Sequence, residues 1–214
     1  MKIYYIYTKY LFLGHPDKKY ITAEEYLDLE RKSIEKHEYY KGEIFPLNRE
    51  FDTVEINAMS GDSKFHNEIA ANLMYELKHK LKGKSCRPYG SDYRINIPNN
   101  SLFTYPDLSI FCQEPNSIDN ENDTATNPTV IIEILSHSTR GYDLGEKFFL
   151  YRQIKSLKEY ILIDSLSVNV IKNVKQKDGS WLMSENNDIN ETLFIESIEA
   201  KINIADIYDN VIFK

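Results

Sequence analysis

Two acidic residues and one lysine occupy positions where charged side chains are rare. Asp107 opens a strand-like run over 105–111, and Glu133 lies inside a more apolar run over 129–135. An acidic residue within a central strand costs several kcal/mol unless it is paired, protonated or bound to a metal. Lys147 follows on the expected apolar face of a helix. Two carboxylates and a lysine held on regular structure are a minimal set for metal-assisted phosphodiester cleavage.

The two carboxylates suit a hard divalent cation. If their strands are neighbours, Asp107 and Glu133 converge on one Mg²⁺ or Mn²⁺, ions that prefer oxygen ligands and retain several waters. The main-chain carbonyl of Ile134 is a further candidate ligand. Such a metal lowers the pKa of a bound water and neutralises charge on the phosphate in the transition state. We therefore expect a metal site at Asp107, Glu133 and Ile134.

Lys147 is expected to start from a buried face, because Leu144, Phe148 and Tyr151 bracket it at helical spacings. A partly buried ammonium beside two carboxylates can orient the attacking water or stabilise developing negative charge. The alternative is a structural ion pair between Lys147 and one of the carboxylates, without chemistry. The residues alone leave both alternatives open.

Further ionisable residues are weaker candidates. His66 lies near the start of a predicted helix. It could act as a catalytic base or as a group that supports the metal ligands. Alternatively, it is a core histidine bonded to a backbone carbonyl. Glu38 and Glu43 flank a bend and either could supply a third carboxylate, although both are expected to be exposed. For Asp143, N-capping of the following helix is a sufficient explanation. The remaining histidines lack the ligand spacing of zinc sites.

The periodicity of apolar residues predicts the elements that position these groups. Helices are expected over 22–31, 63–81 and 143–155, with N-caps at 22, within 60–62 and at 143. Strands are expected over 37–45, 53–59, 85–97, 105–111, 129–135, 159–164 and 168–174, with weaker strands over 181–195. Residues 113–127 are polar and acidic without periodicity, which predicts a surface loop. This order predicts an α/β protein with a mixed sheet flanked by helices.

Composition is that of an ordinary globular protein, with 42% hydrophobic and 28% charged residues in 214. We expect an N-terminal extension over 1–20, a core domain over 21–175 and a β-rich C-terminal extension over 176–214, packed on the same domain. No stretch approaches the ~20 apolar residues of a membrane span, and no signal peptide is expected. Cys86 and Cys112 are interpreted as separate structural thiols in a reducing compartment, which indicates the cytoplasm.

Charge and motifs exclude several function classes. The net charge of −7 argues mildly against nucleic acid as a partner, because phosphate binding depends on Lys and Arg. The basic cluster between Lys78 and Arg87 is interpreted as a solvated helix end. The chain has no GxSxG motif, no glycine-rich phosphate loop and no dinucleotide fingerprint, so no organic cofactor is expected.

The residues around the two acids resemble a known family. The runs NPTVIIEILS at 127–136 and STRGYDLGEK at 138–147 closely resemble the Uma family of restriction-endonuclease-like proteins, within the PD-(D/E)XK nuclease superfamily. YPDLS at 105–109 precedes this block and EYILID at 159–164 follows it. Weaker similarity extends the resemblance over roughly residues 22–172.

The resemblance implies a restriction-endonuclease-like core and Mg²⁺-dependent cleavage of DNA, with Asp107 and Glu133 as metal ligands. The superfamily's usual lysine, two residues after the acid, is replaced here by Leu135. In this family the lysine has moved to the next helix, which makes Lys147 the candidate by position. A homodimer is expected by analogy, because two related sites can cut both strands of a duplex.

Two rival hypotheses remain at this point. The first is a catalytically inactive nucleic-acid-binding or scaffold protein that retains the nuclease fold; net acidity and Leu135 favour it, and the retained Asp107, Glu133 and Lys147 count against it. The second is a protein-interaction module that uses the N-terminal arm or the loop over 113–127. This second rival predicts that Glu133→Gln does not abolish activity, and removal of the buried charge could even stabilise the fold.

Overall fold

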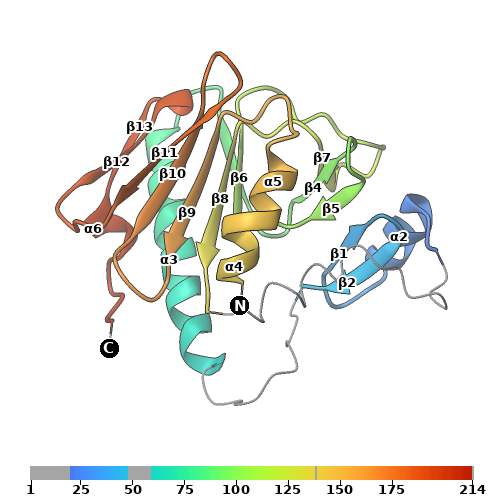
Figure 1. Ribbon diagram of the computed structural model, residues 1–214, viewed down its shortest axis with the longest axis horizontal. Coiled ribbons are helices and arrows are strands. Elements are labelled where there is room, and N and C mark those ends of the chain that lie inside the picture. The colour runs from blue at the N-terminus through green and yellow to red at the C-terminus, as the bar shows by residue number, and fades with distance from the viewer. Residues whose placement is uncertain (1–19, 48–58, 138, 214) are drawn as a thin grey trace.

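A computed structural model describes residues 20–47, 59–137 and 139–213 (Figure 1). Its strands are β1 His37–Tyr40, β2 Glu43–Pro46, β3 Arg87–Gly90, β4 Arg94–Ile97, β5 Leu102–Thr104, β6 Leu108–Phe111, β7 Thr124–Ala125, β8 Val130–Leu135, β9 Glu159–Asp164, β10 Val170–Lys175, β11 Trp181–Asn186, β12 Thr192–Ile195 and β13 Ala200–Asn203. The helical segments are α2 Ala23–Glu30, α3 Met59–Lys80, α4 Arg140–Tyr142, the π-helical turn η1 Asp143–Lys147, α5 Phe148–Tyr151, the 3₁₀ turn η2 Glu196–Ile198 and α6 Ile204–Ile207.

A six-stranded mixed sheet in the order β11-β10-β9-β8-β6-β3 forms the centre of the molecule. In this sheet β8 runs parallel to β9 and antiparallel to β6, with Leu108 opposite Ile132. All residues of β8 and β9 are buried, as expected for strands covered on both faces. Figure 1 shows α3 on one face of this sheet and the segment α4–α5 on the other. The predicted mixed sheet flanked by helices is therefore confirmed.

Helix α3 packs along one face of the sheet through a regular apolar stripe. Ile69, Leu73 and Leu77 are fully buried and Leu81 is nearly so, as their spacing predicts. Burial of each such side chain contributes about 1.5–3 kcal/mol. The same hydrophobic cluster takes in residues of β12, β13 and α6, so the C-terminal segment packs against the sheet beside α3. The boundary at residue 175 stays a prediction.

A second, five-stranded sheet in the order β2-β1-β5-β4-β7 joins the N-terminal segment to the core. Helix α2 begins at the predicted capping box, in which Glu25 N–H donates to Thr22 Oγ1 at 3.1 Å and Thr22 N–H to Glu25 Oε2 at 2.8 Å. Strands β1 and β2 form a hairpin whose turn residues, Lys41 and Gly42, both have positive φ angles. Such a two-residue turn favours glycine, and the predicted bend is confirmed.

Several predicted boundaries are wrong. Helix α3 already includes residues 60–62, so no N-cap lies there, and the predicted strand over 53–58 falls outside the described residues. The next helical segment begins after Thr139, which places Asp143 inside it rather than at its cap, and it ends at Tyr151 instead of Lys155. The loop over 113–127 contributes the short strand β7, paired in parallel with β4.

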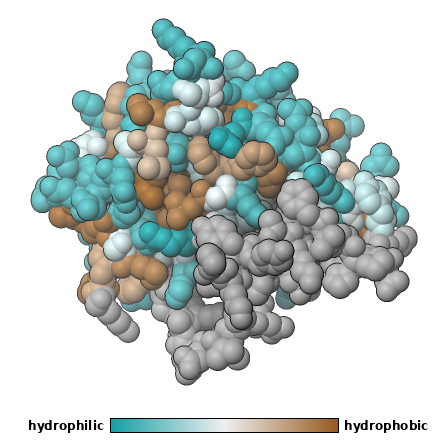
Figure 2. Space-filling view, in the orientation of Figure 1, coloured by the Kyte–Doolittle hydropathy of each residue, from teal (hydrophilic) through white to brown (hydrophobic). Residues whose placement is uncertain are grey.

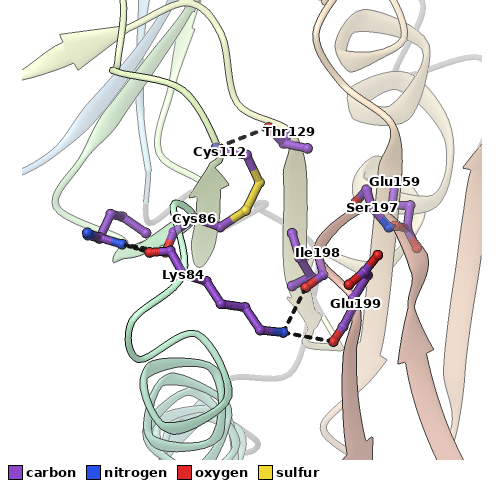
Figure 3. The surroundings of a disulfide bond; sticks show 9 residues. Lys84, Cys86, Cys112, Thr129, Glu159, Ser197, Ile198 and Glu199 are labelled. Atoms are coloured by element: carbon purple, nitrogen blue, oxygen red, sulfur yellow. Dashed lines mark hydrogen bonds between the residues drawn. A yellow bond between two sulfur atoms is a disulfide. The ribbon is translucent and has the colours of Figure 1, made fainter.

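Cys86 and Cys112 form a disulfide that links β3 to β6 (Figure 3). They directly flank the paired residues Arg87 and Phe111, so the antiparallel register brings them together. The prediction of two separate thiols is therefore wrong, because spacing along the chain does not reveal which residues face each other across a sheet. The inference of a reducing compartment loses that support. Beside the disulfide, Lys84 Nζ donates to the carbonyl of Glu199 at 3.0 Å.

Removal of this disulfide is expected to destabilise the fold by about 3 kcal/mol, because the two cysteines close a loop with a sequence separation of 26. The measurement is urea unfolding with and without reductant, beside the double variant Cys86→Ser/Cys112→Ser. Reductant should lower the midpoint of the parent and leave that of the double variant unchanged. Two titratable thiols in the native, unreduced protein would contradict the assignment.

A second buried acid, Glu159, lies at the start of β9 away from the candidate site. Its Oε1 accepts a hydrogen bond from Ser197 N–H at 2.6 Å. Burial, together with a hydrogen bond to Glu196, raises the pKa of Glu159 to about 7. Burial also acts to raise the pKa of Glu196, but its hydrogen bonds with Glu159 and Lys172 lower it overall. The two carboxyl groups therefore share a proton over part of the pH range.

Stability should fall as this proton is lost. Because the pKa of Glu159 is higher in the folded protein than its ordinary 4.5, its contribution is present below about pH 4.5 and is lost as pH rises through about 7. Above that pH, Glu159→Gln should be more stable than the parent by about 1–2 kcal/mol, the lowered pKa of Glu196 offsetting part of the effect. Chemical denaturation between pH 4.5 and 8 tests this, with the exposed Glu121→Gln as control. A constant difference across that range would contradict it.

Within the described ranges, no helix has the length and apolar character needed to cross a membrane.

Candidate active site

Asp107 and Glu133 lie side by side on neighbouring strands. Leu108 of β6 pairs with Ile132 of β8, which places the preceding Asp107 across from the following Glu133. Asp107 N–H donates to Glu133 Oε2 at 3.3 Å, and Ile134 N–H donates to Asp107 Oδ2 at 2.7 Å. The strands are thus neighbours, as the predicted metal site requires. Ile134 contacts Asp107 through its N–H group. A role for its carbonyl as a metal ligand stays a prediction.

Lys147 belongs to the helical segment that covers the face of the sheet away from α3, and its side chain reaches this acid pair. Its side chain is 8% exposed, and Nζ lies 2.8 Å from Glu133 Oε1 and 3.5 Å from Asp143 Oδ1. The aromatic rings of Tyr142 and Tyr151 lie near the ammonium, each with its centroid 5.9 Å from Nζ. The predicted burial of Lys147 is confirmed. The ion pair with Glu133 is compatible with both alternatives for Lys147, a catalytic role and a purely structural one.

Asp143 was not recognisable as a site residue from capping patterns, although its spacing from Lys147 carries a signal. Residues four apart on a helix face each other, and Asp143 and Lys147 form the two ends of the π-helical turn η1. Such turns are rare and occur frequently at functional sites. Asp143 is only 3% exposed, so the turn brings a third carboxylate into the buried cluster.

Glu38 also enters the cluster, through the pairing of β1 with β5. This pairing sets Tyr39 opposite Phe103, so that Glu38 lies beside Thr104, whose hydroxyl donates to Glu38 Oε1. Tyr142 donates to Glu38 Oε2 at 3.4 Å. The predicted exposure of Glu38 is wrong, because the covering partners come from segments distant in sequence. Glu43 is half-buried, one residue beyond the hairpin turn.

His66 contacts the other side of the acid pair from helix α3. Its Nε2 lies 3.1 Å from Asp107 Oδ1, and its side chain is 29% exposed. The partner is therefore a carboxylate and not the backbone carbonyl of the alternative hypothesis. Burial lowers the pKa of His66, but the hydrogen bond and the charge of Asp107 outweigh it and leave the pKa raised. His66 therefore acts as a hydrogen-bond donor that orients the Asp107 carboxylate.

The buried cluster contains more acidic groups than basic ones. Burial raises the pKa of Glu133 to about 8, with added repulsion from Asp143 and Asp107, although the Lys147 ammonium acts in the opposite direction. Burial likewise raises the pKa of Asp143. For Lys147, the surrounding carboxylates outweigh burial and hold its pKa well above the ordinary value. One permanent cation therefore faces several acids in a site of low dielectric constant.

The donor set fits a hard divalent cation. Asp107 and Glu133 supply carboxylate oxygens from adjacent strands, which are the ligands that Mg²⁺ and Mn²⁺ prefer. A bound cation would also offset the negative charge of the ionised acids. In the part of the chain that the structure describes, no group of three His, Cys, Asp or Glu side chains is arranged to hold a metal. A cation held by Asp107 and Glu133 would need waters to complete its coordination, as is usual for Mg²⁺.

Comparison with known proteins assigns the chain to a family. Residues 23–205 match the model of the family Uma2, described as "Putative restriction endonuclease". The chain belongs to this family, and the predicted family membership is confirmed.

Two proteins of Synechocystis sp. (strain PCC 6803) are similar along most of the chain. The uncharacterized protein sll1609 is 35% identical over 167 residues, which are 78% of this chain and 88% of that protein. The uncharacterized protein slr1290 is 34% identical over 193 residues, 90% of this chain and 94% of that protein. The family resemblance therefore extends beyond the block that surrounds Glu133.

A solved structure shares the fold. It is the crystal structure of "a putative nuclease belonging to DUF820" from Anabaena variabilis ATCC 29413. It superposes with a TM-score of 0.67 at 17% identity and covers 90% of this chain and 99% of that chain. The predicted fold class, a restriction-endonuclease-like α/β core, is thereby confirmed.

Proposed function

We propose that this protein is a metal-dependent endonuclease that hydrolyses phosphodiester bonds in DNA. The observation that carries the proposal is the buried Asp107–Glu133 pair with the Lys147 ammonium 2.8 Å from Glu133. Membership of a family described as "Putative restriction endonuclease" supports the reaction class. A buried cluster with this excess of acid is costly for a protein that only binds or scaffolds, which disfavours the inactive alternative.

Each residue has a role that its contacts can support. Asp107 and Glu133 would hold Mg²⁺ or Mn²⁺, and the bound ion would supply an acidified water and polarise the phosphate. Lys147 stabilises negative charge at the reacting phosphate or orients the attacking water. Tyr151 donates to Glu133 Oε1 at 2.9 Å and fixes its rotamer. His66 fixes Asp107 in the same way from the opposite side.

Metal binding tests this proposal independently of the DNA substrate. Calorimetric titration with Mn²⁺ should show binding by the parent at about one ion per chain, and strongly weakened binding by Asp107→Asn. Because the amide keeps the shape of the carboxylate, thermal unfolding of this variant should show that the fold persists. Equal binding by both proteins would remove Asp107 from the site. No binding by the parent would favour the scaffold alternative.

A further inference from the structure

Strand β11 is the last strand on one side of the six-stranded sheet. Among the residues that the structure describes, its one strand partner is β10. At the connecting turn Gln176 N–H donates to Ser180 O at 2.8 Å, and hydrogen-bonded pairs alternate along an antiparallel ladder. Given the register in which Lys172 faces Ser184, the backbone groups of residues 182, 184 and 186 point toward β10. Those of 181, 183 and 185 point outward, away from the sheet.

The edge carries exposed apolar side chains where edge strands usually carry protection. Leu182 and Met183 are 62% and 63% exposed and point to opposite faces of the sheet. Natural edges are commonly protected by charged side chains, proline or a bulge, and residues 181–186 contain no lysine or proline and one charged residue, Glu185. Figure 2 shows further hydrophobic surface toward the middle of the view, where Figure 1 draws α5 and the strands beside it.

A small hollow lies on one face of this edge. It has a volume of about 170 Å³ and is lined by residues of β10, β11 and β12, among them Ser184, Leu193 and Phe194. Leu182 shares the face of Ser184, because residues two apart in a strand point the same way. The hollow has mixed walls, in which Val170, Leu193, Phe194 and Ile204 supply the apolar part, and its volume can accommodate a leucine side chain.

Charge is distributed in opposite senses at the two ends of β11. Lys175, Lys177 and Asp178 lie at the turn before the strand and give it a small net positive charge, whereas Glu185 and Asp188 lie at the far end. A copy of the strand that runs antiparallel would set the basic end of one chain beside the acidic end of the other. Attraction at both ends would then oppose the general repulsion between two chains of net charge −7.

We propose that a second copy of this chain pairs with β11 through its own β11, in antiparallel register about Met183. This register sets Met183 opposite Met183 and Trp181 opposite Glu185 of the second copy, so that the outward backbone groups bond to each other. Leu182 of each copy then lies across from Ser184 of the other, next to the hollow. One two-fold axis thus satisfies the backbone, the apolar side chains and the charges together.

The paired sheets place the two candidate active sites far apart. Seven strand spacings separate β8 of one copy from β8 of the other, or roughly 34 Å. The two-fold axis reverses strand direction, so the sites lie at opposite ends of the joined sheet. Each copy would therefore act on DNA independently, and the pairing does not depend on the proposed nuclease activity.

Sedimentation velocity over a range of protein concentrations tests the pairing without metal or DNA. The parent should shift from 25.1 kDa toward twice that mass as concentration rises. Met183→Lys sets two ammonium groups face to face and should raise the dimer Kd at least about tenfold. Ile212→Lys, at a residue 76% exposed outside the edge, provides the control and should dimerise like the parent.

A second variant separates loss of pairing from loss of folding. Met183→Pro removes an outward N–H and no hydrogen bond to β10, so the edge strand tolerates it. It should unfold at a temperature close to that of the parent and sediment as a monomer. A parent that is monomeric at every concentration, or a dimer that survives in both Met183 variants, would overturn the proposal. Either result leaves the nuclease hypothesis untouched.

Discussion

Replacement of Glu133 by glutamine is expected to reduce metal-dependent DNA cleavage about a thousandfold or more. Glutamine keeps the size of the side chain and can still accept the hydrogen bonds of Lys147 and Tyr151. It removes the charge that holds a cation, and with it several kcal/mol of transition-state stabilisation. The fold should persist, because Asp143 remains close enough to balance Lys147. Initial rates of plasmid nicking measure the loss.

The chain supplies a matched control for this variant. Glu159 is also a buried glutamate and lies on the adjacent strand β9, opposite Val130 of β8. Its carboxylate accepts a hydrogen bond from Ser197 N–H, and it lies three residues along β9 from Leu162, the residue paired with Glu133. Glu159→Gln should therefore cleave at the rate of the parent. Comparable rates in all three proteins would show that Glu133 takes no part in cleavage.

Replacement of Lys147 by methionine is expected to destabilise the protein by about 3–5 kcal/mol, because it leaves Glu133 and Asp143 buried without a cation. Methionine preserves the length of the side chain, so loss of packing contributes little. Lys172→Met provides the control. Lys172 also lies 2.8 Å from a carboxylate, Glu196, but that carboxylate is 47% exposed, and such pairs contribute about 1 kcal/mol or less.

A double variant identifies the cause of this destabilisation. If the uncompensated charge of Glu133 is responsible, Lys147→Met/Glu133→Gln should recover much of the stability lost in Lys147→Met. Urea unfolding of the parent, both single variants and the double variant gives the coupling free energy. Additive effects would mean that the 2.8 Å contact between Lys147 and Glu133 contributes little to stability.

The sequence was most informative where function and burial impose opposing demands. A glutamate within the apolar run over 129–135 is conspicuous because the central strand would be more stable without it. Lys147 on an apolar helix face is conspicuous for the same reason. Alternation within 105–111 and 129–135 then sufficed to predict that Asp107 and Glu133 meet if their strands pair, and the structure confirms that they do.

The features that could not be predicted depend on contacts between distant segments. Glu38 is buried because β1 pairs with β5 and Tyr142 reaches across from another layer. The disulfide of Cys86 and Cys112 arises from strand register, which has no local signature. The sequence around Asp143 also matches the pattern of a helix N-cap. Asp143 lies in the cluster because the helix starts earlier than that pattern predicts, at Arg140.

The most direct test of the central claim is plasmid nicking by the purified protein, titrated with Mg²⁺ and Mn²⁺. The geometry of Asp107, Glu133 and Lys147 predicts conversion of supercoiled to nicked plasmid that requires one of these ions and stops when a chelator removes it. No cleavage of duplex or single-stranded DNA at any concentration of either ion would contradict it.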